Sequence, residues 1–337
     1  MSEPMRLTIS EIRRETAEAA TFVFDDPHRD VGGVSGQHVV VRVAIDGQEH
    51  RRVFSLSSSP ELGQAPSITV KRLPGGIVST YFVERVTVGE MVEVEPAAGV
   101  FQVGIATENN RTYFAFVAGS GSVPVLSIVR TVLAKEPGST CHVAYGNRTE
   151  GDVIFSGELG DLVAANPGRL TVTHVLSGAG DRIDHRFVND YLMVHPPTSL
   201  DVRYLVSGPP GMNDVVVARL RSLGIMDVHV MVEHYLPPTR EDSPVPYHGA
   251  IVRVEGSDET VEVPGGETIL AALTRGGAPV VYACQSGVCG TCRAELVSGD
   301  VDEGLPFVLS DEERHRGVIL TCVSRPLSAE VVVRLLG

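Results

Sequence analysis

The feature that most constrains this chain is the spacing of four of its five cysteines. Four residues separate Cys284 from Cys289, two separate Cys289 from Cys292, and twenty-nine separate Cys292 from Cys322. In the spacing C-x4-C-x2-C…C, three thiolates from one loop and a fourth from a distant segment hold a [2Fe–2S] cluster. We therefore expect Cys284, Cys289, Cys292 and Cys322 to be metal ligands.

The loop between these cysteines has the small residues that such a site needs. Gly287, Gly290 and Thr291 stand where the backbone must pass close to the sulfides. Glycine tolerates the φ angles of a tight loop, and the N–H groups of the loop can then point at the sulfur atoms. The composition of the loop thus agrees with the ligand spacing.

Two other uses of cysteine have to be weighed against a cluster. A disulfide framework is typical of secreted proteins, but residues 1–6 show no apolar signal segment. A structural zinc site usually has two short C-x2-4-C hooks, whereas this chain has one triple hook and one single cysteine. We favour the cluster over both. The fifth cysteine, Cys141, lies in an apolar run and is expected to be a buried structural thiol.

Length and charge limit the possible functions. The chain has 337 residues, 43% of them hydrophobic, which predicts two or three domains with packed cores. No apolar run approaches the roughly eighteen residues of a membrane span, and we expect a cytoplasmic protein. The net charge of −14 argues against nucleic acid and anionic membranes as partners.

Residues 1–105 have the pattern of an antiparallel β-barrel, because short apolar runs recur between turn signals. The stretch from Ile77 to Arg85 lacks turn residues and is predicted to form a short helix. The predicted strands include Thr21–Phe24, Val39–Val43, Ser67–Val70 and Met91–Val94.

Residues 106–235 alternate strand-like and helical stretches, which predicts an α/β domain with a parallel sheet. The first strand runs into Gly119-Ser120-Gly121, where glycines allow backbone N–H groups to approach the phosphates of a dinucleotide. The predicted strands are Tyr113–Ala118, Cys141–Tyr145, Leu170–Leu176 and Arg203–Ser207, and the predicted helices include Val125–Leu133 and Asn213–Leu223.

The last part of the chain begins after a segment rich in proline and charge, 236–247, which we interpret as a semi-rigid linker. Residues 248–337 carry thirteen acidic and seven basic side chains, a net charge of −6. Strands near Ala250–Val254 and Glu259–Val263 and a helix near Thr268–Arg275 are expected. Together with the cysteine loop, this segment resembles a plant-type ferredoxin, an α+β domain.

Two motifs of the barrel resemble the flavin-binding elements of the ferredoxin–NADP reductase superfamily. They are Arg52-Val53-Phe54-Ser55 and Gly75-Gly76-Ile77-Val78-Ser79. The resemblance implies that the barrel binds FAD and that Arg52 pairs with its phosphate. A planar guanidinium suits this role because it can form two parallel hydrogen bonds to a phosphate. It implies that Phe54 packs on the isoalloxazine ring, that Ser55 hydrogen-bonds near N5, and that backbone groups at Gly76, Val78 and Ser79 meet the phosphates. The family more often has tyrosine where Phe54 stands.

The nucleotide lobe resembles the same superfamily at two turns. These are Gly119-Ser120-Gly121-Ser122-Val123-Pro124 and Ser207-Gly208-Pro209-Pro210-Gly211-Met212. The resemblance implies that Gly119, Gly121, Pro124, Gly208, Pro209 and Met212 bind NAD(P)H and that Ser55 and Ser207 are catalytic. The family commonly has cysteine at position 207 and threonine at position 123. Arg148 falls where the family reads the adenosine 2′ position, and we expect it to favour NADPH.

The order of flavin barrel, nucleotide lobe and ferredoxin resembles the reductase components of bacterial oxygenases, such as phenylacetyl-CoA epoxidase and 3-ketosteroid 9α-hydroxylase. The resemblance implies that electrons pass from NAD(P)H through FAD and the [2Fe–2S] cluster to a terminal oxygenase. Two alternatives remain. One is a reductase for a Rieske or another diiron oxygenase, and the other is a non-enzymatic redox carrier or sensor with a weakened nucleotide site.

Overall fold

The computed structural model describes residues 4–234, 249–257, 260–264, 266–282, 287, 290–303 and 308–336. The chain divides into two compact units, Met1–Tyr235 and Leu236–Gly337, and each is described by itself. The predicted linker at 236–247 lies outside the described residues. Two of the predicted cluster ligands, Cys284 and Cys289, also lie outside them.

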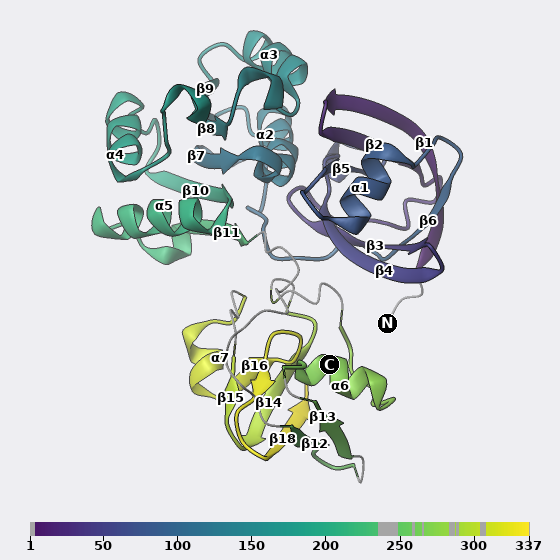
Figure 1. The fold of residues 1–337 in the computed structure, drawn as a ribbon. Helices are drawn as coiled ribbons and strands as arrows, with labels where there is room; N and C mark the ends of the chain where they lie inside the picture. The colour runs from purple at the N-terminus through teal and green to yellow at the C-terminus, as the bar shows by residue number, and fades with distance from the viewer. Residues whose placement is uncertain are drawn as a thin grey trace. The chain divides into compact units, whose positions relative to one another are not determined.

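The first sheet is antiparallel and has the strand order β4-β3-β6-β1-β2-β5 (Figure 1). An isolated bridge between Leu56 and Ile68 joins the chain just after β4 to β5, so that the sheet curls toward closure. The rings of Phe22 and Phe54 both pack on Phe82 of helix α1 in the barrel core. The predicted antiparallel barrel is thereby confirmed. Its elements are β1 (Met5–Thr16), β2 (Ala19–Asp25), β3 (His38–Ile45), β4 (Gln48–Ser55), β5 (Ser67–Lys71), α1 (Ile77–Glu84) and β6 (Met91–Val94).

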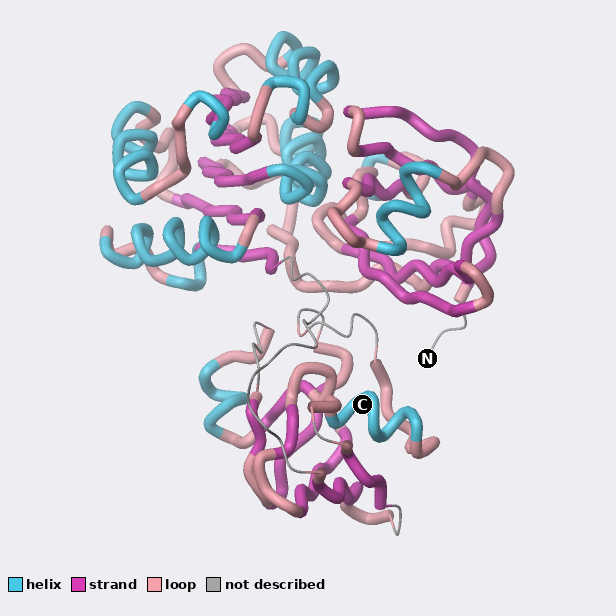
Figure 2. The backbone as a smooth tube through the Cα atoms, viewed as in Figure 1, coloured by secondary structure: helices cyan, strands magenta, loops and turns pink. Residues whose placement is uncertain are grey.

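The second sheet is parallel throughout and has the strand order β11-β10-β7-β8-β9. Buried side chains of α2 and α3 form one core with the sheet, and those of α4 and α5 form another core with it. Figure 2 shows these two pairs of helices on opposite sides of the strands. This confirms the predicted α/β lobe. Its elements are β7 (Arg111–Ala118), α2 (Ser122–Lys135), β8 (Thr140–Asn147), α3 (Ser156–Ala165), β9 (Leu170–Leu176), α4 (His185–Val194), β10 (Asp201–Gly208), α5 (Pro210–Ser222) and β11 (Val230–His234).

The second unit is built on a mixed sheet with the strand order β13-β12-β18-β14-β16, beside a two-stranded ribbon of β15 and β17. Helix α6 begins at a cap, because the hydroxyl oxygen of Thr268 accepts the N–H of Ala271 at 3.3 Å. The elements are β12 (Ala250–Val254), β13 (Thr260–Val263), α6 (Ile269–Arg275), β14 (Arg293–Ser298), β15 (Val301–Asp302), α7 (Asp311–His315), β16 (Val318–Leu320), β17 (Arg325–Pro326) and β18 (Glu330–Leu335).

No helix among these described residues is long and apolar enough to cross a membrane.

Candidate functional site

Two glycine turns meet at the carboxyl end of the parallel sheet. A side chain at Gly121 would place its Cβ 2.1 Å from the carbonyl oxygen of Ser207, so only glycine fits against the second turn. At Gly208, a Cβ would lie 2.5 Å from Cε of Met212 and 3.3 Å from Cβ of Ala118. The structure therefore brings together the two turns that the sequence predicted to bind a nucleotide.

The other predicted residues of these turns have distinct environments. Gly119 has a φ of +53°, in the left-handed region that favours glycine. Val123 and Pro124 are buried in the first turn of α2, so the side chain of Val123 contributes to the core. Pro209 is exposed and directly precedes α5.

A carboxylate joins the two residues predicted to be catalytic. Ser55, at the end of β4 in the barrel, donates a hydrogen bond from Oγ to Oε1 of Glu233 at 2.8 Å. Ser207, at the end of β10 in the nucleotide lobe, donates from Oγ to Oε2 of the same carboxylate at 3.2 Å. Glu233 lies in β11 and pairs with Ser207 across the sheet. One side chain thus links the barrel to the nucleotide lobe at the predicted reaction centre.

Burial of Glu233 raises its pKa to about 7, although the hydrogen bonds from Ser55 and Ser207 oppose the shift. Desolvation disfavours the charged form of a carboxyl group, and hydrogen bonds donated to it favour that form. Near neutral pH this group can therefore either hold a proton or accept both serine hydroxyls.

Sequence reasoning missed Glu233. In the sequence, Glu233 is distinguished only as the charged residue that follows the apolar stretch Val230–Val232. Such residues are common at strand ends, and the two partners of this one lie 178 and 26 residues away in the chain.

Arg52 offers a cation to the flavin site. Its side chain is half-buried, and burial lowers the pKa of its guanidinium. Within the described residues it makes no ion pair, and its Nη1 donates only to the carbonyl oxygen of its neighbour Arg51, at 2.7 Å. A partly desolvated guanidinium without a carboxylate fits an anionic group such as a phosphate.

The remaining predicted flavin residues surround the start of α1. A Cβ at Gly76 would lie 2.4 Å from Oγ of Ser79, so the helix start has no room for a side chain there. The hydroxyl of Ser79 is engaged within the loop, since it accepts the N–H of Leu73 at 3.1 Å. Val78 is buried in the barrel core, and the Phe54 ring lies 5.6 Å from that of Phe82. Only backbone groups of Gly76, Val78 and Ser79 are therefore available to a ligand.

A second residue that the sequence reasoning missed is Lys71, at the end of β5. Its Nζ lies 3.7 Å from the position that a Cβ would take at Gly119. Among described residues it has no ion-pair or hydrogen-bond partner in the structure. An unpaired ammonium beside the glycine turn fits the negative charge of a dinucleotide. The one feature of the sequence that sets Lys71 apart is that the chain has a single other lysine, Lys135.

The end of β8 carries the residues predicted to read the adenosine ribose. Arg148 is exposed and forms no ion pair with a described residue. The preceding Asn147 is only 7% exposed, and both polar atoms of its amide lack a hydrogen-bond partner among the described residues. Buried polar groups are normally paired, so this amide fits a lobe that takes a polar ligand or water. Asp152 is held by Thr149, which donates to it from Oγ1 at 2.7 Å.

In the second unit, two of the four predicted cluster ligands can be placed. Cys292 and Cys322 are each 3% exposed and belong to one apolar cluster. The carbonyl oxygen of Cys292 accepts the N–H of Thr321 at 3.1 Å and its Oγ1–H at 3.2 Å. These bonds bring the distant segment with Cys322 against the cysteine loop, as a shared metal site requires. The two buried thiols therefore fit a [2Fe–2S] cluster.

The loop around Cys292 is fastened by Arg293. Its Nη1 donates to the carbonyl oxygen of Gly290 at 2.8 Å, and its Nε pairs with Oε1 of Glu313 at 3.0 Å. Gly290 has a φ of +74°, and a Cβ there would lie 2.0 Å from the guanidinium. The glycine is thus required both by the backbone and by the close approach of Arg293.

Three known protein families match separate parts of the chain. Residues 6–103 match the oxidoreductase FAD-binding domain, residues 116–218 the oxidoreductase NAD-binding domain, and residues 252–327 the 2Fe-2S iron-sulfur cluster binding domain. The chain is 32% identical to a subunit of 1,2-phenylacetyl-CoA epoxidase from Escherichia coli (strain K12), over 97% of this chain and 96% of that protein. It belongs to this family of flavin and iron–sulfur reductases.

Two further proteins extend the comparison. The ferredoxin reductase component of 3-ketosteroid-9-alpha-monooxygenase from Rhodococcus rhodochrous is 32% identical, over 97% of this chain and 95% of that protein. The solved structure of phthalate dioxygenase reductase superposes with a TM-score of 0.70, covers 98% of both chains and is 24% identical, so it shows the same fold.

This reductase is an NAD(P)H-dependent oxidoreductase with binding domains for FAD and a [2Fe–2S] cluster. The family assignment supports an enzyme over the alternative of a non-enzymatic carrier.

Proposed function

We propose that this reductase takes electrons from NAD(P)H and delivers them singly to a terminal oxygenase of the phenylacetyl-CoA epoxidase type, with domain boundaries at 1–105, 106–235, 236–247 and 248–337. The relatives named above are components of oxygenase systems, and they match nearly the whole chain. The observation that carries the proposal is the Glu233 carboxylate, which joins Ser55 of the flavin barrel to Ser207 of the nucleotide lobe.

At the flavin site, Arg52 binds the phosphate through its guanidinium, which forms no ion pair with a described residue. The backbone at Gly76, Val78 and Ser79 provides N–H groups at the start of α1. Phe54 supports the ring system from the barrel core, with one side already packed on Phe82. A bound flavin supplies the change from two-electron to one-electron transfer, because it can accept electrons as a pair and release them singly. The barrel itself binds and orients.

At the nucleotide site, the turns at Gly119–Gly121 and Gly208–Met212 give the dinucleotide a surface with little side-chain bulk. Pro124 fixes the first turn of α2, and Lys71 neutralises part of the pyrophosphate charge. Pro209 leads into α5 at the edge of the same site.

Between the two sites, Ser55 and Ser207 orient the reacting rings, and Glu233 sets the direction of their hydroxyls. An ionised Glu233 accepts both hydroxyls, while its protonated form donates one hydrogen bond instead. In its ionised form it would also favour positive charge on a nicotinamide ring bound beside it.

In the second unit, Cys284, Cys289, Cys292 and Cys322 would hold the cluster. Arg293 fixes the backbone beside Cys292 through its bonds to Gly290 and Glu313. A reductant such as NAD(P)H and four cysteines kept as thiolates both fit the cytoplasm.

Coupled turnover tests the choice of partner. The purified reductase is mixed with NAD(P)H and with purified oxygenase components of three kinds, a phenylacetyl-CoA epoxidase, a Rieske oxygenase and another diiron hydroxylase. Product formation should be fastest with the epoxidase. Faster turnover with the Rieske component, or with the other diiron hydroxylase, would replace the proposed partner.

We also propose a preference for NADPH, based on Arg148. It is exposed at the end of β8, and the nearby Asp152 is engaged by Thr149, so no described carboxylate pairs with the guanidinium. Arg148→Ala should lower kcat/KM for NADPH selectively. The control is Arg186→Ala, an exposed arginine of α4 whose partner is Asp190. A wild type that prefers NADH, or equal losses for both nucleotides, would show that Arg148 does not read a 2′-phosphate.

A further inference from the structure

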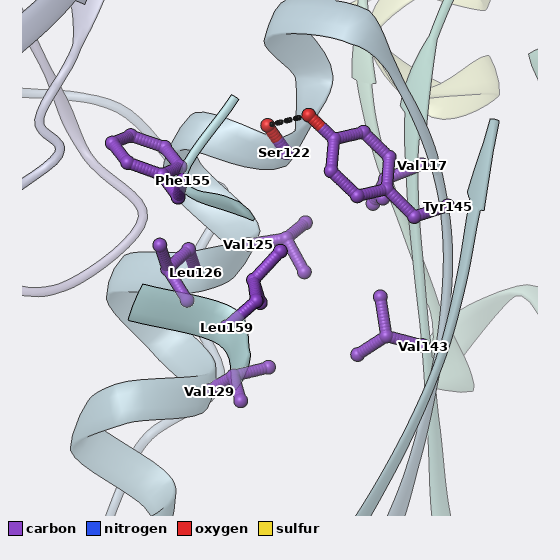
Figure 3. Close-up of a pocket in the computed structure, with 9 residues that line it drawn as sticks. All are labelled: Val117, Ser122, Val125, Leu126, Val129, Val143, Tyr145, Phe155 and Leu159. Atoms are coloured by element: carbon purple, nitrogen blue, oxygen red, sulfur yellow. Dashed lines mark hydrogen bonds between the residues drawn. The ribbon is translucent and has the colours of Figure 1, made fainter. Parts of the chain in front are cut away.

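A buried tyrosine lies directly behind the first glycine turn. Tyr145 of β8 is fully buried, and its hydroxyl lies 3.1 Å from the carbonyl oxygen of Gly119. The same hydroxyl lies 2.9 Å from Oγ of Ser122, the contact drawn in Figure 3. Ser122 itself donates to the same carbonyl at 2.9 Å. The hydroxyl therefore joins strand β8 to both ends of the turn between β7 and α2.

The bond to Gly119 acts on one peptide group, the one that joins Gly119 to Ser120. A trans peptide is planar, and its C=O and N–H point in opposite directions. A Gly119 carbonyl held toward Tyr145 therefore turns the N–H of Ser120 away from the core. Glycine has the widest choice of backbone angles, so this peptide plane needs its carbonyl to be held. Besides the two hydroxyls, the backbone N–H of Ser122 also bonds to the Gly119 carbonyl.

The hydroxyl lies beside a narrow cavity that gives it little access to water. The cavity is lined mainly by apolar side chains, among them Val125, Leu126 and Phe155 (Figure 3). Burial also raises the pKa of Tyr145 to about 12, so the hydroxyl keeps its proton at any pH at which the enzyme works.

We propose that Tyr145 is a positioning residue for NAD(P)H: its hydroxyl fixes the Gly119–Ser120 peptide so that the N–H groups of the turn face the pyrophosphate. The hydroxyl does not touch the nucleotide, because it lies inside the core. This inference rests on the proposed function of the turn as the pyrophosphate site.

The test is Tyr145→Phe in the full-length holoenzyme, with NADPH and NADH as substrates and NADP⁺ as the binding probe. Loss of one hydrogen bond should raise KM and the NADP⁺ dissociation constant about threefold to tenfold. The value of kcat at saturating nucleotide, the flavin content and the cluster content should stay at wild-type levels. A residue that only stabilised the fold would not separate KM from kcat.

The control is Tyr113→Phe. Tyr113 is a buried tyrosine of the neighbouring strand β7, 1% exposed, whose hydroxyl donates to Oε2 of Glu136 at 3.0 Å, away from the turn. It should leave KM and the NADP⁺ dissociation constant unchanged. Equal increases in both variants, or no increase with Tyr145→Phe, would overturn the proposal. Should Tyr145→Phe fail to fold, Ser122→Ala is measured against the same expectations, since it removes the other hydroxyl on the Gly119 carbonyl.

A third variant, Ser120→Pro, removes the N–H that the tyrosine is proposed to aim. If it weakens NADP⁺ binding while Tyr145→Phe does not, the turn binds pyrophosphate and only the role of Tyr145 is wrong. If neither variant weakens binding, the assignment of the turn fails as well.

Discussion

Replacing Glu233 by glutamine should change how the stability of the first unit depends on pH. Burial raises the pKa of Glu233 from 4.5 to about 7. At about 1.36 kcal/mol per unit, this shift corresponds to a free energy of about 3 kcal/mol. The folded-state pKa of Glu233 lies above its unfolded-state pKa. The contribution of protonated Glu233 to the free energy of unfolding is therefore fully present below about pH 4.5 and is lost as the pH rises through 7.

Glutamine cannot ionise, so the free energy of unfolding of the variant does not fall over this pH range for this reason. The free energy of unfolding of Glu233→Gln, measured relative to wild type, should therefore rise by about 2.5 kcal/mol between pH 5 and pH 8. The assay is urea unfolding of both holoenzymes at a fixed flavin concentration, followed by flavin fluorescence at several pH values. Curves that stay parallel for the two proteins would refute the reasoning.

A second variant, Ser55→Ala, tests how a hydrogen bond changes the pKa of Glu233. The hydrogen bond from Ser55 lowers the pKa of Glu233 and so opposes the effect of burial. Ser55→Ala should therefore move the pH at which stability is lost to a higher value, without removing the loss. An unchanged or lower midpoint would show that the Ser55 hydroxyl does not stabilise the ionised carboxylate.

Three further predictions follow from the sites. Arg52→Ala should raise the flavin dissociation constant about tenfold to a hundredfold, since a hydrogen bond to a charged group is lost, and full flavin occupancy after dilution would argue against the phosphate contact. Cys292→Ser should remove the EPR signal of the cluster and leave flavin bound, whereas an unchanged signal would disprove the ligand assignment. A fragment that ends near Tyr235, the boundary of the first unit, should still reduce ferricyanide with NAD(P)H but lose most cytochrome c reduction. Undiminished cytochrome c reduction would show that electrons leave by another route.

The architecture was largely predictable because its signals are local. Apolar runs and turn residues predicted the strands of the barrel, and the alternation of strands with helices predicted the parallel sheet. The long strand β1 (Met5–Thr16) escaped notice because only Leu7 and Ile9 are buried in it, and its second half is charged and exposed. No apolar run marks it, although it lies between β6 and β2 in the sheet.

The site was predictable in part. Ser55 and Ser207 came from motifs, and the structure brings both to one carboxylate. Glu233 and Lys71 could not be found in the same way, because neither belongs to a motif that was recognised. Their importance depends on which residues lie beside them after folding: Glu233 meets serines from two lobes, and Lys71 reaches the glycine turn of a lobe to which its own strand does not belong.

The central claim is that electrons pass from NAD(P)H through the flavin to the iron–sulfur cluster. Anaerobic titration with NADPH, followed by flavin absorbance and by EPR of the same samples, tests this claim most directly. We expect the flavin absorbance to bleach and the signal of a reduced [2Fe–2S] cluster to appear, while in Cys292→Ser only the flavin bleaches. A flavin that bleaches in the wild type while the cluster remains oxidised, or a flavin that NADPH and NADH both fail to reduce, would contradict the account.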